Sequence, residues 1–239
     1  MVHRHDQVRL VWNPRRAECN HRHPGPGQST LTAEWIIALG CRAGAAQAVG
    51  RVAGESIRIK RRTHVASGCR VVLVRPRYPE NVGAVARAMR VTGLSRLVLV
   101  SPGSLAQVSS DAARKMAVGA RSVLNQARCA TDLGEALDGC ALSLATTARR
   151  GQRGVLTPRE AAARVVEACV RGESAAIVFG DERHGLRRRE VQMCSSVVRI
   201  PMVANEPSLN LAQAAMVVLY EVMCAALEAG SSGLAAGRA

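Results

Sequence analysis

Short apolar runs alternate with amphipathic stretches along most of the chain, from residue 69 onward. Runs such as RVVLV at residues 70–74 and AAIVF at residues 175–179 are almost wholly apolar, which is typical of buried strands. The predicted strands cover residues 70–74, 96–100, 141–145, 175–179 and 196–200, and the predicted helices cover residues 81–92, 111–117, 132–137, 158–170, 186–194 and 209–228. Apolar strands that alternate with helices indicate an α/β fold, a parallel sheet with helices on both faces.

The last predicted helix, residues 209–228, is apolar on nearly every side. Between residues 209 and 227 its few polar side chains are Asn210, Gln213, Tyr220 and Glu221. Such a helix has to be covered all round, and we expect one face to meet the sheet and another to form a homodimer interface. A membrane span is the alternative, but we expect no membrane because these polar groups are costly in lipid.

The first 67 residues differ in composition from the rest of the chain. They hold five of the six histidines and both tryptophans, and the His-, Pro- and Gly-rich stretch at residues 20–30 cannot lie inside a helix or strand. One interpretation is a basic arm that grips RNA. The other, which we favour, is a poorly ordered extension translated from a start codon upstream of the true one. We therefore divide the chain into a basic N-terminal extension (1–67), a domain (68–230) and a flexible tail (231–239).

The chain is strongly basic, with 33 Lys and Arg against 18 Asp and Glu and a net charge of +15. This excess favours a polyanionic partner, and guanidinium groups suit phosphate because they donate hydrogen bonds in a fork. A genomic bias toward arginine codons also explains the preference for arginine over lysine. Aromatic residues make up only 2% of the chain, which argues against nucleic-acid binding by a row of stacked side chains.

Eight cysteines are scattered along the chain without a C-x-x-C pair, and the histidines do not complete a zinc-binding spacing. Scattered thiols in a chain with no clear secretion signal indicate reduced, mostly buried cysteines. We therefore expect a cytoplasmic protein that needs no metal.

Ligands of a parallel sheet bind beyond the carboxyl ends of its strands, and three polar segments are predicted there. In the first, residues 78–87, Asn81 as N-cap and Gly83 open a helix whose free N–H groups attract an anion. Arg87 follows Gly83 by four residues, so the two share a helix face, and we expect Gly83 to leave room beside the guanidinium. Taken alone, an Asn N-cap and a surface arginine are also ordinary structural features.

The second segment, residues 179–186, places a glycine directly after a strand, which permits close approach of the backbone. Asp181, Glu182 and His184 are side chains that can act as acid, base or metal ligand. We expect His184 to be an exposed loop residue and not a ligand.

The third segment, residues 200–211, joins the last predicted strand to the last helix. Ser208 fits an N-cap, and Asn210 either satisfies the backbone or contacts a ligand. No G-x-G-x-x-G follows a strand, and the chain has neither a P-loop nor a G-x-S-x-G motif. Dinucleotide oxidoreductases, P-loop NTPases and α/β-hydrolases are therefore disfavoured.

Taken together, NVGAVARAMRVTGL, IVFGDERHGL and IP followed by EPSLNLAQA resemble the three motifs of the SPOUT RNA methyltransferases. Over residues 69–230 the chain is similar to the TrmH family, and within it to the TrmJ-like tRNA 2′-O-methyltransferases. The resemblance implies a C-terminal trefoil knot, an obligate homodimer and S-adenosylmethionine as cofactor. It also implies methylation of a ribose 2′-hydroxyl of tRNA, at a cytidine or uridine of the anticodon loop.

The resemblance also implies catalytic roles for five residues. Arg87 orients the hydroxyl and stabilises alkoxide character, because the pKa of a guanidinium is too high for a general base. Asn81 positions Arg87 or the ribose, and Glu182 fixes its own loop or a partner arginine. Ser208 and Asn210 hold the cofactor loop and the active-site backbone. The implied cofactor-binding residues are Ala145, Thr146, Thr147, Phe179, Gly180, Gly185, Ile200, Pro201, Ser208 and Leu209.

The chain departs from the family pattern in three places. Arg75 stands where many relatives carry an acidic or amide residue, and we expect it to add positive charge beside the site. The chain ends soon after the last helix, whereas TrmJ-like proteins often continue, and its N-terminal extension does not resemble the recognition domain of some relatives. Two alternatives therefore stand beside the tRNA enzyme: a ribosomal RNA 2′-O-methyltransferase, and a non-catalytic basic RNA-binding protein on the same fold.

Overall fold

The computed structural model describes residues 64–101, 108–152, 154–203 and 208–236, all within the unit that covers Gly50–Ala239. The predictions for residues 1–63, including the poorly ordered extension and the RNA-gripping arm, lie outside the described residues, as do residues 237–239. The first described element is the 3-10 helix η1 (His64–Gly68). It buries Ala66 in the core.

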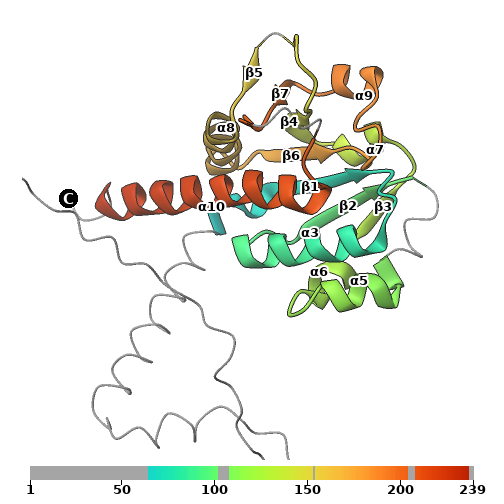
Figure 1. The fold of residues 1–239 in the computed structure, drawn as a ribbon. Coiled ribbons are helices and arrows are strands. Elements are labelled where there is room, and N and C mark those ends of the chain that lie inside the picture. The colour runs from blue at the N-terminus through green and yellow to red at the C-terminus, as the bar shows by residue number, and fades with distance from the viewer. Residues whose placement is uncertain (1–63, 102–107, 153, 204–207, 237–239) are drawn as a thin grey trace, which may run out of the picture. The chain divides into compact units, whose positions relative to one another are not determined.

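Seven strands of the described chain form one sheet in the order β3-β2-β1-β6-β4-β7-β5 (Figure 1). Each strand is parallel to its neighbours, so the prediction of a parallel sheet is confirmed. The strands are β1 (Cys69–Val74), β2 (Arg96–Val100), β3 (Arg128–Ala130), β4 (Cys140–Thr146), β5 (Val155–Leu156), β6 (Ser174–Phe179) and β7 (Ser196–Val198).

Helices cover both faces of this sheet, as the apolar strands predict. Side chains alternate along a strand, so Val71 and Leu73 of β1 enter one core cluster while Val72 and Val74 enter another. The first cluster packs against η1, α3 (Pro79–Thr92), α5 (Asp111–Met116), α6 (Arg121–Asn125), α8 (Pro158–Val170) and α10 (Leu211–Ala236). The second packs against α7 (Leu133–Leu137) and α9 (Arg188–Gln192).

The prediction missed η1, β3, β5 and α6, and extended α9 and β7 too far. Strands β3 and β5 are the edges of the sheet and pair on one side only. They therefore have no long apolar run to mark them. Helix α9 begins late because the backbone N–H of Arg187 donates to the Glu190 carboxylate at 2.6 Å, which fixes the helix start at Arg188.

Helix α10 begins two residues later than predicted and runs eight residues further, to Ala236. Six of the nine residues assigned to a flexible tail are therefore helical. One face of α10 is buried through Ala215, Val218, Leu219, Val222 and Ala226. That face packs against α3 and α8, and α10 lies beside α3 in Figure 1.

The stretch Leu211–Gly230 of α10 is long and apolar enough to cross a membrane by length and composition alone. A core helix of a soluble protein passes the same test. One face of this stretch packs against α3 and α8, whereas Val217 and Tyr220 on α10 are exposed.

The six cysteines within the described ranges are free thiols. Burial raises the pKa of the Cys69 thiol, and it raises that of Cys194 to about 11. Both groups therefore stay protonated at neutral pH and act as small apolar side chains in the core.

Candidate active site

A cavity of about 290 Å³ lies where β4, β6 and β7 end at their carboxyl edge. This is the edge at which open parallel sheets bind ligands, and the volume is close to the lower limit of small-molecule sites. Of the residues expected to bind cofactor, Thr146, Thr147, Phe179, Gly180, Gly185, Ile200, Ser208 and Leu209 line the cavity. Ala145 lies instead in the second core cluster, and Pro201 is exposed outside the cavity wall.

The loop of residues 180–186 closes on itself beside the cavity. The backbone N–H of Gly185 donates to the carbonyl of Asp181 at 2.9 Å. A Cβ on Gly180 would lie 2.1 Å from the carbonyl carbon of Gly185 and 2.2 Å from the nitrogen of Leu186, and Gly185 itself has a φ of +65°. Both glycines are therefore required by the shape of the loop.

Asp181 supports this loop from inside. Its carboxylate accepts hydrogen bonds from the backbone N–H groups of Arg183 (2.9 Å) and His184 (2.7 Å), and its side chain is only 8% exposed. The imidazole of His184 is 72% exposed, as expected. Asp181 thus has a structural position, and among the described residues no group of three or more His, Cys, Asp or Glu could hold a metal ion.

Glu182 points away from Asp181, at the N-terminus of α3. Its carboxylate accepts from the backbone N–H groups of Arg77 (2.8 Å) and Tyr78 (3.3 Å) and from Nδ2 of Asn81 (2.7 Å). Tyr78, the N-cap residue, gives α3 no side-chain cap. A carboxylate from a loop 101 residues further along the chain therefore satisfies the donors at this helix start and complements its dipole.

The expectation that Asn81 is the N-cap of α3 is wrong. The helix starts two residues earlier, at Pro79, whose ring suits the first helical position because it lacks an N–H. Asn81 lies in the first turn, where its side chain is free to bridge two loops. Nδ2 of Asn81 donates to Glu182, and Oδ1 accepts from Nδ2 of Asn210 at 3.1 Å.

Asn210, and not Ser208 as expected, caps the last helix. Its Oδ1 accepts from the backbone N–H of Ala212 at 2.8 Å. Glu182, Asn81 and Asn210 thus form one hydrogen-bonded chain, which we call the amide–carboxylate chain. It joins all three sequence segments beside the cavity. Ser208 is exposed and lines the cavity.

Arg87 lies apart from this arrangement. It is exposed on α3, does not line the cavity, and makes no hydrogen bond or ion pair within the described part of the chain. Gly83 does not leave room beside it, because a Cβ on Gly83 would lie 2.1 Å from the carbonyl oxygen of Ala113. A backbone carbonyl of α5 occupies that space, so Gly83 allows α3 and α5 to pack closely.

Arg75 does not add free positive charge to the site, contrary to expectation. Its guanidinium donates to both carboxylate oxygens of Glu190, with Nη2 to Oε2 at 3.0 Å, and Nη2 lies 3.8 Å from Oδ2 of Asp181. The hydrogen bond to Glu190 raises the pKa of Arg75. Burial alone would raise the pKa of Asp181 and of Glu190. For Asp181 the backbone hydrogen bonds, and for Glu190 the bond to Arg75, turn the net shift downward.

This ion-pair network predicts a pH-dependent contribution to stability. Carboxyl groups whose pKa is lowered by folding stabilise the protein above their ordinary pKa of about 4, and this stabilisation is lost as pH falls through the lowered values. We therefore expect Arg75→Met to lower the free energy of unfolding by about 1–3 kcal/mol at pH 7 and by less at pH 3. Urea unfolding of both proteins at the two pH values measures this.

Arg171→Met is the matched control for that experiment. Arg171 also pairs with two carboxylates, Glu167 and Glu173, but all three side chains are well exposed, so solvent screens the pairs. A pH-independent loss in Arg75→Met, or an equal loss in the control, would show that the Arg75 network is not the source.

Arg149 lines the cavity although none of the predicted segments includes it. Arg149 donates from Nη2 to the carbonyl oxygen of His184 at 3.0 Å, which brings the loop after β4 against the loop after β6. A contact between loops this far apart in sequence leaves no local pattern to find.

The fold is an open parallel sheet, and three loops form a cavity at its carboxyl edge. This is the arrangement of an α/β domain that binds its ligand at that edge. The sequence model of the SpoU rRNA Methylase family matches residues 68–220. The chain belongs to this family.

Named relatives refine the comparison. TrmJ of Pseudomonas aeruginosa (strain UCBPP-PA14), a tRNA (cytidine/uridine/adenosine-2′-O-)-methyltransferase, is 44% identical over 162 residues, which are 67% of this chain and 62% of that protein. A probable methyltransferase from Bordetella pertussis Tohama I has a TM-score of 0.65 at 33% identity, over 68% of this chain and 98% of that one. TrmJ from Z. mobilis ZM4 has a TM-score of 0.59 at 39% identity, over 64% and 67%. The chain therefore spans less than two thirds of the Pseudomonas relative.

Proposed function

We propose that this protein is an S-adenosylmethionine-dependent RNA 2′-O-ribose methyltransferase whose substrate is tRNA, at a cytidine or uridine of the anticodon loop. The observation that supports it most is the amide–carboxylate chain, because Glu182, Asn81 and Asn210 come from three distant segments and meet beside one cavity. The relatives from Pseudomonas aeruginosa and Z. mobilis carry the name TrmJ, and the former is named for 2′-O-methylation of tRNA.

The cavity fits the proposed cofactor in its chemistry. Phe179, Leu186, Ile200 and Leu209 supply apolar walls, which suit an adenine ring. Thr147 and Ser208 line the same cavity, and their hydroxyl groups suit the polar parts of the molecule. When bound, S-adenosylmethionine supplies a methyl group on a sulfonium.

Arg87 is the residue that we propose to act on the ribose. A 2′-hydroxyl is a poor nucleophile until charge developing on its oxygen is stabilised, and a fork of guanidinium donors provides that stabilisation. In its own chain Arg87 lies outside the cavity wall, so we propose a homodimer in which the partner subunit brings Arg87 to the cavity. The exposed Val217 and Tyr220 on the apolar helix α10 offer a surface for that interface.

The other proposed site residues act by positioning. Glu182 and Asn81 hold the start of α3, and with it the helix that carries Arg87. Asn210 ties the start of α10 to Asn81. Ser208 faces the cavity and contributes to the cofactor loop.

A trefoil knot is also part of the proposal. Strand β7 lies between β4 and β5, although those two are consecutive in the chain. The connection from β4 to β5 therefore has to cross the end of β7, and the chain that leaves β7 has to pass by this connection. That arrangement is what the threading of residues 200–211 through a loop requires. We further propose a cytoplasmic protein, in keeping with its free thiols.

Methyl transfer from radiolabelled S-adenosylmethionine tests the proposed function. We expect the full chain to label bulk tRNA lacking its natural ribose methylation, and nuclease digestion to recover the label as 2′-O-methylcytidine or 2′-O-methyluridine. No label in ribose, although the cofactor binds, would leave a non-catalytic RNA-binding protein. Ribosomal RNA is the second substrate to assay in parallel, because the family is described by rRNA methylation. Label in ribosomal RNA alone would replace tRNA as the substrate.

A further inference from the structure

In the segment of residues 181–190, with sequence DERHGLRRRE, the acidic and the basic side chains lie in different surroundings. It holds three acids and four arginines. All three carboxylates have partners inside the fold: Asp181 on its own loop and near Arg75, Glu182 at the start of α3, and Glu190 on Arg75. The side chains of Asp181 and Glu190 are only 8% and 13% exposed.

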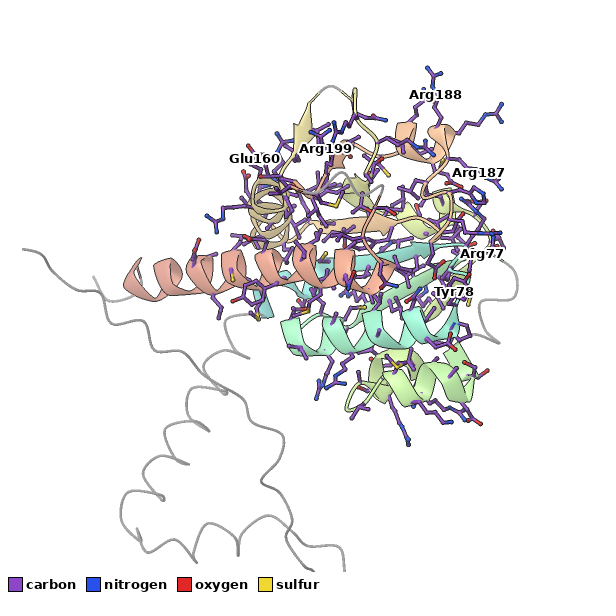
Figure 2. The ribbon with its side chains drawn as sticks, viewed as in Figure 1. Arg77, Tyr78, Glu160, Arg187, Arg188 and Arg199 are labelled. Carbon is purple, nitrogen blue, oxygen red and sulfur yellow. The ribbon has the colours of Figure 1, made fainter. Side chains whose placement is uncertain are left out.

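The arginines of this segment, in contrast, lie on the surface. Arg183, Arg187, Arg188 and Arg189 are all exposed. Arg183, Arg188 and Arg189 make no side-chain hydrogen bond or ion pair with any described residue. Figure 2 shows Arg188 projecting from α9 away from the ribbon. The acids of this segment therefore make no ion pair with Arg183, Arg188 or Arg189.

Two further arginines extend this cationic surface across the cavity. Arg149 and Arg150, in the loop after β4, are exposed, and the bond from Arg149 to the carbonyl of His184 holds that loop against residues 180–186. Arg149 and Arg183 also line the cavity, whereas Arg187, Arg188 and Arg189 do not. We call the six residues the arginine surface; it starts at the cavity and continues over α9.

We propose that the arginine surface binds the phosphodiester backbone of an RNA substrate, outside the nucleotide that enters the cavity. The proposal rests on the proposed function and adds the surface that holds the RNA. Unpaired guanidinium groups are suited to phosphate because their forked donors bind two phosphate oxygens at once. Contacts to phosphate give affinity and register without reading sequence, and they make affinity depend steeply on salt.

The test measures binding of fluorescently labelled tRNA transcript by anisotropy across a series of salt concentrations, with the full chain and its Arg188→Gln/Arg189→Gln variant. Each phosphate-binding cation contributes about 1 to the slope of log affinity against log salt. We expect the slope to fall by about 2 in magnitude and affinity near 0.1 M salt to fall at least roughly tenfold. Thermal unfolding and binding of S-adenosylmethionine should match the unmodified protein, because neither arginine lines the cavity.

Arg164→Gln/Arg171→Gln is the matched control. It removes the same charge from α8 and its C-cap, and α8 covers the opposite face of the sheet from α9. We expect its slope to stay within about 0.5 of the unmodified protein. An unchanged slope in the α9 variant, or an equal loss in the control, overturns the arginine surface. Binding of duplex DNA or anionic vesicles as tightly as tRNA at the same salt overturns RNA as its partner.

The same experiment separates this inference from the proposed function. If the unmodified protein methylates tRNA but the α9 variant binds RNA as tightly, only the arginine surface is wrong. If the variant loses RNA affinity while the unmodified protein never methylates RNA, the surface stands and the proposed activity fails.

Discussion

Replacement of Arg87 by alanine should lower the rate of methyl transfer to tRNA by a factor of roughly 100 to 1000, the cost of removing one donor that stabilises a developing oxyanion. Binding of S-adenosylmethionine should be unchanged, because Arg87 lies outside the cavity wall. The thermal midpoint should also be unchanged, since Arg87 is exposed and has no partner among the described side chains. Single-turnover transfer of label and calorimetric cofactor binding measure the two effects separately.

Arg90→Ala is the matched control for this result. Arg90 is another exposed arginine, one turn further along α3, and its loss removes the same charge. We expect it to retain most of the activity. Arg87→Lys should recover little, because an ammonium lacks the planar fork of the guanidinium. Full activity in Arg87→Ala would refute the proposed mechanism, and an equal loss in Arg90→Ala would point to general attraction of RNA instead.

Replacement of Gly180 by alanine should weaken cofactor binding by up to roughly 100-fold. The new Cβ would lie 2.1 Å from the carbonyl carbon of Gly185 and 2.2 Å from the nitrogen of Leu186, and backbone atoms cannot turn aside as a flexible side chain can. The loop of residues 180–186 would have to open. Overpacking of this kind costs about 1–3 kcal/mol. When the loop conformation that binds the cofactor is destabilised by about 3 kcal/mol, the affinity falls roughly 100-fold.

Gly134→Ala tests whether this effect belongs to the loop. Gly134 lies in α7, where the nearest atom to a new Cβ is a carboxylate oxygen of Asp132 at 3.1 Å, and where alanine is the better helix former. We expect its cofactor affinity to match the unmodified protein. Tight cofactor binding by Gly180→Ala would show that the loop does not form the cofactor site.

The sequence predicts the strands and helices whose side chains are buried, because burial requires apolar residues at a regular spacing. Val71 to Val74 are apolar on both faces because helices cover both sides of β1, and Val82, Val85, Ala86 and Met89 recur at helical spacing because one face of α3 meets the sheet. The edge strands β3 and β5 pair on one side only. Their residues need not be apolar, and nothing in the pattern separates them from loops.

The sequence predicts which segments form the site, but not the contacts between them. The order of the motifs placed Asn81, Glu182 and Asn210 in the same predicted site. The hydrogen bonds among them, however, join residues 101 and 129 positions apart. The pairing of Arg75 with Glu190 likewise spans 115 positions. The cap of α3 failed for the same reason: local rules favoured Asn81, whereas the distant carboxylate of Glu182 accepts the hydrogen bonds at this helix start. The cap of α10 is local, but it is Asn210 and not Ser208.

The hydrogen bond from Asn210 to Asn81 has a consequence for the order of events during synthesis. Its two ends lie 129 residues apart, so a ribosome must have released nearly the whole domain before the bond can form. Contacts of such long range slow folding because a large loop has to close first. A nascent chain that still lacks α10 therefore has no completed cavity, because Leu211 and Ala214 of α10 line it, and ligand capture has to wait until α10 has been made.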